Sequence, residues 1–231
     1  MSLRAVASSI YRKRLSITDK LNRLVDFNEA VPAFANVKHF VNADAGRPDQ
    51  NPTVKVPFYR YLNDVALKDV PIDYLEFGVF RGWSMKHWLE INRHPDSRFF
   101  GFDSFKGLPE RWMDGREAGH FDRQGQPPQI DDPRVQWVIG LFQETLPGFL
   151  KTFRNERQLV VHIDCDLYAG TLFALASLHT FMPAGTVIFF DEFYDVQHEF
   201  AGFYDYCKVF MREWEAVAYR DAFVQAGVRL L

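Results

Sequence analysis

From residue 72 onward, short runs of hydrophobic and β-branched residues alternate with stretches whose apolar positions recur at helical spacing. Strands that alternate with helices predict βαβ units and a mainly parallel sheet, and therefore an α/β fold. The predicted strands of this sheet are IDYLEF (72–77), RFFGFD (98–103), RVQWVI (134–139), LVVHID (159–164) and GTVIFF (185–190).

The end of the chain follows another pattern. The strand-like runs EAVAYRD (215–221) and VQAGVRLL (224–231) have almost no residues between them. A parallel crossover needs a connection of about a dozen residues or more, so we expect these two strands to pair antiparallel. Many dinucleotide-binding folds continue with another crossover at this point, so a terminal hairpin argues against such a fold.

The other segments complete the predicted organisation. Residues 1–54 read as a helical and irregular N-terminal extension, and residues 55–231 as the main domain, entered through the helix VPFYRYLNDVAL (56–67). The segment 114–133 is polar and rich in glycine and proline. It predicts a long loop, and long ordered loops in compact domains often serve as lids.

Composition narrows the class of protein. Hydrophobic residues make up 47% of the 231 residues, and 23 are phenylalanine, which predicts a large core or a cleft rich in aromatic rings. The net charge of −3 gives no reason to expect a nucleic-acid partner. Two cysteines, no apolar run long enough to span a membrane and no apolar signal segment favour a cytoplasmic protein.

The stretch YLEFGVFRGWS (74–84) joins a predicted strand to a predicted helix. Glu76, Gly78 and Gly82 give it the spacing E-x-G-x-x-x-G, which differs from the G-x-G-x-x-G of dinucleotide-binding turns. The glycines suit either an ordinary tight turn or a backbone cleared for a ligand. Ser84, in the first helical turn, lies beside free backbone N–H groups that suit a carboxylate.

A second acid supports the ligand interpretation. Asp103 ends the next predicted strand, where an acidic side chain grips the ribose hydroxyls of a bound nucleotide cofactor. That arrangement serves nicotinamide nucleotides and S-adenosylmethionine alike. The alternative role for Asp103 is a turn or cap residue before SFKGLPE.

Four acids follow the last two predicted parallel strands. Asp164 and Asp166 lie at i and i+2, and Asp191 and Glu192 end the next strand. Carboxylates that converge in this way need a cation or protons, and hard oxygen ligands suit Mg²⁺ or a similar divalent cation. Acids at strand ends also serve as caps and turn residues. His198 is either a base facing the substrate or an ordinary first-turn residue.

Five strings resemble, in order and spacing, class I S-adenosylmethionine-dependent O-methyltransferases. The resemblance is greatest to the macrocin O-methyltransferase type, whose members methylate sugar hydroxyls on natural products. It covers residues 55–231, and GFDSFKGLPE is its most specific string. The strings are YLEFGVFRGWS (74–84), GFDSFKGLPE (101–110), LFQETLP (141–147), HIDCDLYAGT (162–171) and GTVIFFDEF (185–193).

The resemblance implies a Rossmann-like class I methyltransferase fold. We expect a seven-stranded, mostly parallel sheet with a C-terminal antiparallel hairpin and helices on both faces. For S-adenosylmethionine it implies Glu76 and Gly78 near the amino group, Ser84 at the carboxylate and Asp103 at the ribose. The remaining cofactor-binding residues that it implies, the first three of them near the adenine, are Ser104, Gly140, Leu141 and Asp164.

The resemblance also implies a metal-dependent reaction. Asp164, Asp191 and Glu192 take the positions of the Mg²⁺ ligands, and Asp166 takes that of the general base, with His198 as a second candidate. The Asp-Glu pair departs from the commoner Asp-Asp or Asp-Asn, and its extra methylene leaves open whether Glu192 contacts the metal.

The predicted activity is methyl transfer to a hydroxyl of a small molecule, most readily a sugar of a natural product. The alternatives are a phenolic acceptor, a nicotinamide-dependent oxidoreductase, and a cofactor-binding protein without activity. The missing G-x-G-x-x-G and the terminal hairpin argue against the second, and the retained acids against the third. We expect neither nucleic acid nor membrane as partner, and a homodimer through the N-terminal helices is one possibility.

Overall fold

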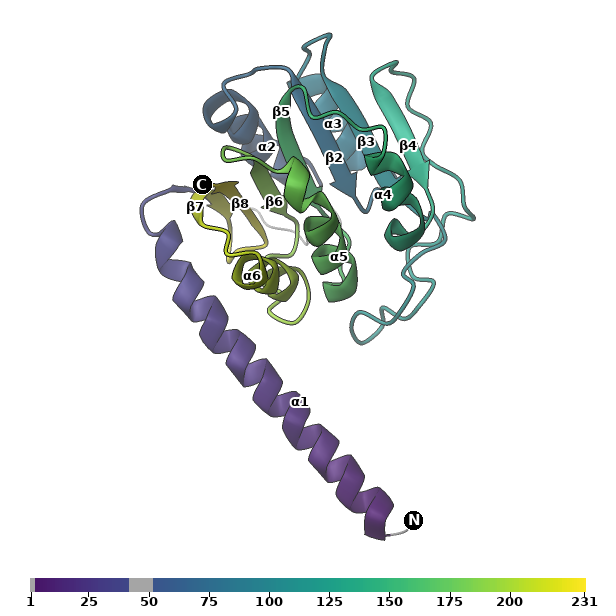
Figure 1. Cartoon of the computed structure of the whole chain (residues 1–231), viewed down its shortest axis with the longest axis vertical. Coiled ribbons are helices and arrows are strands. Elements are labelled where there is room, and N and C mark those ends of the chain that lie inside the picture. The colour runs from purple at the N-terminus through teal and green to yellow at the C-terminus, as the bar shows by residue number, and fades with distance from the viewer. Residues whose placement is uncertain (1–2, 42–51) are drawn as a thin grey trace.

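The computed structural model describes residues 3–41 and 52–231, and these residues form one twisted sheet with helices on both faces (Figure 1). The strand order is β1-β7-β8-β6-β5-β2-β3-β4. All neighbouring pairs are parallel except those of β8, which runs antiparallel to both β6 and β7. The strands are β1 (Lys38–Phe40), β2 (Ile72–Phe77), β3 (Arg98–Asp103), β4 (Val135–Ile139), β5 (Gln158–Ile163), β6 (Val187–Phe190), β7 (Trp214–Arg220) and β8 (Gln225–Leu230).

This architecture confirms the predicted α/β fold with a terminal antiparallel hairpin, but the strand count was wrong. The described residues form eight strands rather than seven. The additional strand is β1, which comes from the predicted N-terminal extension and pairs in parallel with β7 at the edge of the sheet. A strand of only three residues has no periodicity to reveal it in the sequence.

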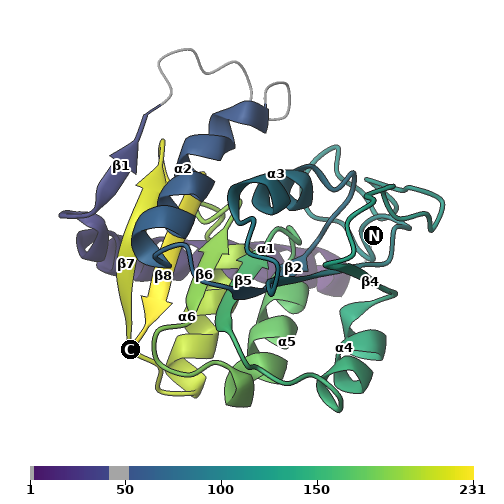
Figure 2. The ribbon, with the colours of Figure 1, turned by 90° about the horizontal axis from the view of Figure 1, so that it is seen from above.

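Helices cover both faces of the sheet (Figure 2). A hydrophobic core lies on each face. Helices α2 (Val56–Tyr61) and α3 (Trp83–Ile91) pack on one face. The other face carries α4 (Phe142–Leu150), α5 (Tyr168–Leu178) and α6 (Glu199–Val209). Because both faces are covered, β2 and β6 are buried at every position, which explains why their sequences read as continuous apolar runs. Short helical turns are η1 (Val31–Phe34), η2 (Pro52–Lys55), η3 (Leu62–Ala66) and η4 (His179–Phe181).

The N-terminal helix α1 (Leu3–Ala30) projects from the body, and its C-terminal end joins the core (Figure 1). There the Phe27 ring contacts Phe193, Phe200 and Phe223 edge-on or tilted, with ring centroids 5.0–6.2 Å apart. Arg23 donates two hydrogen bonds of 2.7 Å to Asp205 on α6. The predicted extension is therefore partly built into the main core; its residues 42–51 lie outside the described residues. Among the described helices, α1 included, none combines the length and apolarity required to cross a bilayer.

The first glycine of the turn after β2 is required by the end of the neighbouring strand β5. Gly78 has φ +92°, and a Cβ there would lie 1.8 Å from the carbonyl oxygen of Asp164, the residue after β5. The pairing of β2 with β5 continues here, since the Asp164 N–H donates to the Phe77 carbonyl at 2.9 Å. The side chain is absent because two strand ends meet, a cause that the sequence did not reveal. Gly82 similarly admits the Pro128 ring, which would lie 2.6 Å from a Cβ placed on this glycine.

We expect Gly78→Ala to destabilise the protein by about 3 kcal/mol, because it combines a left-handed backbone with a backbone collision. Gly148→Ala is the matched control. Gly148 lies within α4 and has open space at its Cβ position, so alanine there should be neutral or stabilising by about 0.5–1 kcal/mol. Urea denaturation of both variants measures the difference, and equal stabilities would contradict this account of Gly78.

Candidate active site

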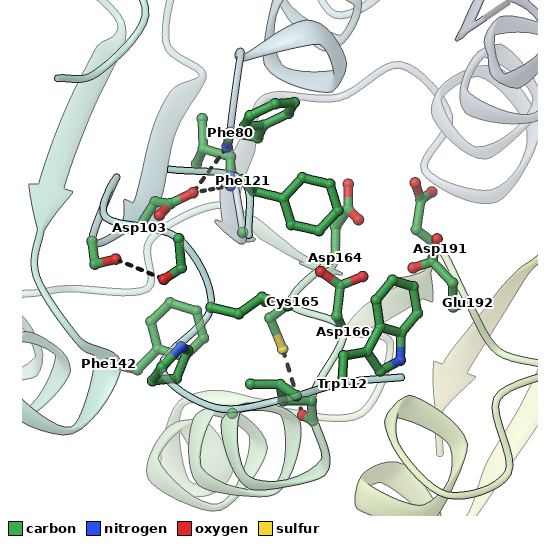
Figure 3. A pocket seen from close by; sticks show the side chains of 18 of the residues that line it. Phe80, Asp103, Trp112, Phe121, Phe142, Asp164, Cys165, Asp166, Asp191 and Glu192 are labelled. Atoms are coloured by element: carbon green, nitrogen blue, oxygen red, sulfur yellow. Dashed lines mark hydrogen bonds between the residues drawn. The ribbon is translucent and has the colours of Figure 1, made fainter. Parts of the chain in front are cut away.

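A cavity of about 470 Å³ opens at the carboxyl ends of β2, β3, β5 and β6 (Figure 3). Ligands of open α/β sheets bind at this edge, and the volume suits a small organic molecule. Of the residues predicted to bind the cofactor, all but Glu76 line it: Gly78, Ser84, Asp103, Ser104, Gly140, Leu141 and Asp164. The predicted acids Asp166, Asp191 and Glu192 also line it, whereas His198 does not.

Asp103 holds the glycine turn in place. Its Oδ2 accepts the N–H groups of Val79 and Phe80, both at 2.9 Å, and its Oδ1 accepts that of Phe105 at 2.7 Å. Asp103 thus has the turn-forming role that the sequence offered as the alternative to ribose binding. A carboxylate has about four acceptor positions, so the side chain keeps capacity for a further donor from the cavity.

Glu76 and Ser84 belong to a buried polar layer beneath the cavity. Ser84 Oγ lies 3.2 Å from the Tyr59 hydroxyl. Glu76 is 1% exposed, and burial together with the charge of Asp164 raises the pKa of its carboxyl well above the usual range. Glu76 Oε2 has no hydrogen-bond partner among the described residues. His162 lies 3.9 Å from Glu76 Oε1, and burial lowers its pKa, which keeps the imidazole neutral.

The predicted acids form two overlapping groups. Oxygen atoms of Asp164, Asp166 and Glu192 lie within 4.8 Å of one another, and atoms of His162, Asp164 and Asp191 form a second such group that shares Asp164. Burial raises the pKa of the Asp166 and Glu192 carboxyls well above the usual range, and the neighbouring acids raise both further. Glu192 Oε2 is buried without a hydrogen-bond partner among the described residues. The site therefore gathers carboxyl groups whose ionised forms the protein itself compensates poorly.

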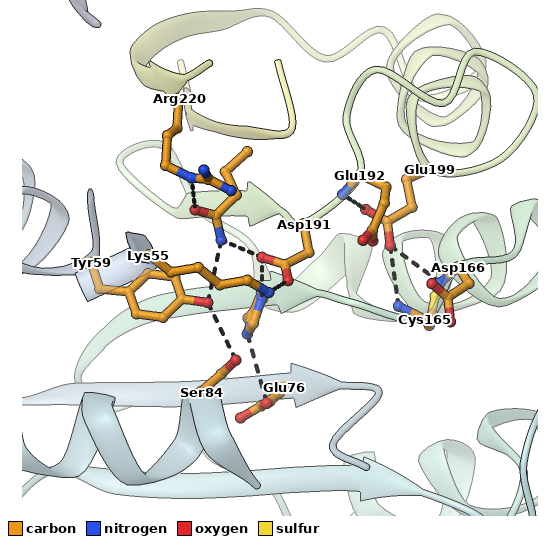
Figure 4. A network of polar contacts seen from close by, with 12 residues as sticks. Lys55, Tyr59, Glu76, Ser84, Cys165, Asp166, Asp191, Glu192, Glu199 and Arg220 are labelled. Atoms are coloured by element: carbon orange, nitrogen blue, oxygen red, sulfur yellow. Dashed lines mark hydrogen bonds and ion pairs between the residues drawn. The ribbon is translucent and has the colours of Figure 1, made fainter. Parts of the chain in front are cut away.

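Lys55 was not singled out in the sequence. It ends η2, lines the cavity, and places its ammonium against Asp191 Oδ2 in a short ion pair (Figure 4). Gln225 of β8 donates to the other oxygen of Asp191. Asp191 is consequently engaged on both oxygens by the protein itself. The only signal was a lone cation directly before the apolar helix VPFYRYL.

Glu199 is the second residue that sequence reasoning missed. It begins α6, is fully buried, and accepts three backbone N–H groups (Figure 4). Its Oε1 accepts those of Cys165 at 3.1 Å and Asp166 at 3.3 Å, and its Oε2 accepts that of Glu192 at 3.1 Å. One carboxylate thus fixes both turns that carry the clustered acids. In the sequence it is indistinguishable from an acid in the first turn of an ordinary helix.

His198 has a local structural contact instead of a place in the cavity. It precedes α6, and its Nδ1 accepts the backbone N–H of Tyr168 at 3.3 Å. This position gives no support to the catalytic role predicted for it.

The polar segment after β3 forms one wall of the cavity. As predicted, residues 114–133 are irregular, with no helix or strand of their own. Just before them, Trp112 Nε1 donates to Asp195 Oδ2 at 2.9 Å, which ties this segment to the turn after β6. The Arg116 guanidinium packs over the Phe121 ring, lines the cavity and lowers the pKa of Asp166 against the dominant effect of burial. The lid role of this segment stays a prediction.

Comparison with known proteins identifies the family. The model of the macrocin O-methyltransferase (TylF) family matches residues 57–209, well over half of the 231 residues. The chain belongs to the macrocin O-methyltransferase family. It is accordingly an S-adenosylmethionine-dependent O-methyltransferase, and the predicted nicotinamide alternative is set aside. A search of curated proteins found no match.

Solved structures of methyltransferases share the fold. The calicheamicin methyltransferase CalS11 superposes with a TM-score of 0.58 at 20% identity, covering 80% of each chain. The O-methyltransferase NovP gives 0.55 at 23% identity, covering 76% of this chain and 78% of its own. A structure of CalS11 without ligand, a TDP-rhamnose 3′-O-methyltransferase, gives 0.55 at 21% identity, with 79% and 81% covered. At these identities the likeness shows the class I methyltransferase fold alone.

We expect Glu199→Gln to lower the free energy of unfolding by about 1–3 kcal/mol, because the amide offers one oxygen where the carboxylate offers two. Hydrogen exchange measured by NMR should quicken at the N–H groups of Cys165, Asp166 and Glu192. Glu213→Gln, the same change at an exposed position after α6, is the control. Unchanged exchange at all three amides would show that Glu199 does not hold the turns.

Proposed function

We propose that this methyltransferase acts on a hydroxyl of a sugar, free or attached to a natural product, and that it requires a divalent cation. The observation that carries the proposal is a pair of possible ligand groups beside the glycine turn. They share Asp164, which one group combines with Asp166 and Glu192 and the other with His162 and Asp191. The activity of CalS11, a TDP-rhamnose 3′-O-methyltransferase with the same fold, supports a sugar acceptor.

In this proposal the cofactor lies along the ends of β2, β3 and β4. S-adenosylmethionine supplies a methyl group on a positively charged sulfur. Asp103, whose carboxylate keeps acceptor capacity, receives the ribose hydroxyls, and Ser84 receives the carboxylate at the start of α3. Gly140 and Leu141, which precede α4, border the adenine together with Ser104. Glu76 precedes the turn, and the resemblance places the amino group of the cofactor near it; its buried Oε2 has no hydrogen-bond partner among the described residues.

The acid cluster fits a divalent cation. Its donors are carboxylate oxygens, which Mg²⁺ prefers, and the buried Glu192 Oε2 lacks a partner among the described residues. We assign Asp164, Asp191 and Glu192 as ligands, with Lys55 as the counter-charge of Asp191 when no cation is bound. The cation, when bound, lowers the pKa of the acceptor hydroxyl and orients it.

Asp166 is the proposed general base. Its oxygen lies within 4.8 Å of Asp164 and Glu192 oxygens, so a hydroxyl held at the cluster is within reach. Asp166 has φ +63°, a left-handed conformation that Glu199 stabilises by accepting its N–H. The Arg116 guanidinium favours the ionised carboxylate that a base needs.

We expect Asp166→Asn to lower kcat roughly 100-fold or more with a sugar acceptor, while leaving Mn²⁺ binding unchanged. Asp191→Asn should instead weaken Mn²⁺ binding, followed by electron paramagnetic resonance. A phenolic acceptor ionises more readily, so a small effect of Asp166→Asn on kcat would favour that alternative acceptor. Loss of Mn²⁺ binding in Asp166→Asn would identify Asp166 as a metal ligand rather than the general base.

We also expect Asp164→Asn to stabilise the metal-free protein at neutral pH by about 1 kcal/mol while abolishing methyl transfer. Burial raises the pKa of the Asp164 carboxyl, so its ionised form opposes folding once the pH exceeds the carboxyl's unfolded value. Mg²⁺ should raise the melting temperature of the wild type and change that of the variant less. Scanning calorimetry with Mg²⁺ and with a chelator measures both, and full activity in chelator would contradict the cation requirement.

A further inference from the structure

A second, more open pocket adjoins the active-site cavity. It is lined by Arg81, Lys86, Arg123 and the segment 126–129, and we call it the basic pocket. Arg81 lines both this pocket and the main cavity, so the two are contiguous. No acidic side chain lines the basic pocket, whereas the main cavity holds the acid cluster at the tips of β5 and β6.

The positive charge of the basic pocket is not compensated by the protein. Within 3–41 and 52–231, no salt bridge involves Arg81, Lys86 or Arg123. Arg123 Nε is buried without a hydrogen-bond partner among the same residues. Arg81 and Lys86 are exposed to solvent, but the buried Arg123 Nε is costly to leave without an acceptor, so this donor favours a bound anion.

The pocket is built on a fixed scaffold. Gly82 packs so closely on Pro128 that there is no room for a side chain between them, which joins the start of α3 to the segment 126–129. The N–H groups of Arg123 and Gly125 both donate to the Phe105 carbonyl, at 3.0 and 2.7 Å. Lys106 lies beside the same segment, with its Cε 3.7 Å from a Cβ position on Gly125. The backbone that carries Arg81 and Arg123 is therefore held in place before any ligand binds.

We propose that the basic pocket binds a phosphate or diphosphate group of the methyl acceptor. Arginine guanidinium groups pair with phosphate oxygens through two parallel hydrogen bonds, and lysine adds a point charge. The acid cluster repels such a group while the basic pocket attracts it, so the acceptor can enter in one orientation only, with its hydroxyl at the acids. This inference rests on the proposed function, because it names the acceptor of that reaction as a phosphorylated sugar.

The anionic group of the cofactor itself is the main competing ligand. The carboxylate of S-adenosylmethionine would lie near Ser84 and so near Arg81. Lys86 and Arg123, however, line only the basic pocket. Variants at these two positions therefore separate acceptor binding from cofactor binding, and Arg81 is left unchanged in the test.

The test is isothermal titration calorimetry of the full chain with dTDP, with inorganic pyrophosphate and with S-adenosylhomocysteine. We expect Lys86→Gln and Arg123→Gln each to weaken dTDP binding by about tenfold or more and to leave S-adenosylhomocysteine affinity unchanged. Lys151→Gln, which removes an equal charge at an exposed position outside both pockets, should change neither.

Each outcome bears on one claim. If the variants lose equal affinity for dTDP and for pyrophosphate, the result supports a sugar phosphate as acceptor. If dTDP binds much more tightly than pyrophosphate and its binding depends on the same residues, the result supports a nucleotide-activated sugar. The inference is overturned if wild-type protein fails to bind either probe, if the variants bind dTDP as the wild type does, or if they lose S-adenosylhomocysteine instead. Failure of the wild type to bind S-adenosylhomocysteine would refute the proposed function independently of the basic pocket.

Discussion

The acids at the tips of β5 and β6 repel one another. The surrounding structure must hold them together against this repulsion. Asp164, Asp166 and Glu192 lie together with raised pKa values, so the protein alone does not stabilise their charged forms. Glu199 adds a further buried acid, yet it binds three backbone N–H groups and so holds the two turns against that repulsion. An arrangement that opposes folding and is nonetheless fixed so firmly is expected of a site selected for chemistry.

The sequence predicted the parallel sheet and its hairpin because each long strand carries its own run of apolar and β-branched residues. It missed β1, whose three residues acquire strand geometry only by pairing with β7. The same limit applies to the site. Acids at strand ends were found because parallel strands must end at a common edge. Lys55 and Glu199 were missed because they come from segments with no such rule, and only the folded chain brings them to Asp191 and to the acid turns.

Two of the predicted site residues line the cavity and also have structural roles that only the structure reveals. Gly78 lies at the cavity, and its missing side chain is required by the Asp164 carbonyl. Asp103 also lines the cavity, yet it first serves the backbone of the glycine turn. A residue pattern records that a position is constrained without recording which contact constrains it. Structural and ligand-binding roles are moreover compatible here, because the turn that Asp103 shapes is the one on which the cofactor would lie.

The residues that enclose the acid cluster come mainly from outside the parallel core. Lys55 precedes α2, which packs on the face of the sheet opposite to α4, α5 and α6. Gln225 belongs to the terminal hairpin. Trp112 and Arg116 belong to the irregular segment after β3, which also continues into the basic pocket at Arg123. The parallel strands thus supply the reacting acids, and the peripheral elements supply the opposing positive charge. Under the proposed function, this division lets one fold keep its chemistry while its acceptor changes, because the strand ends would carry out the reaction and the cations around them would select the acceptor.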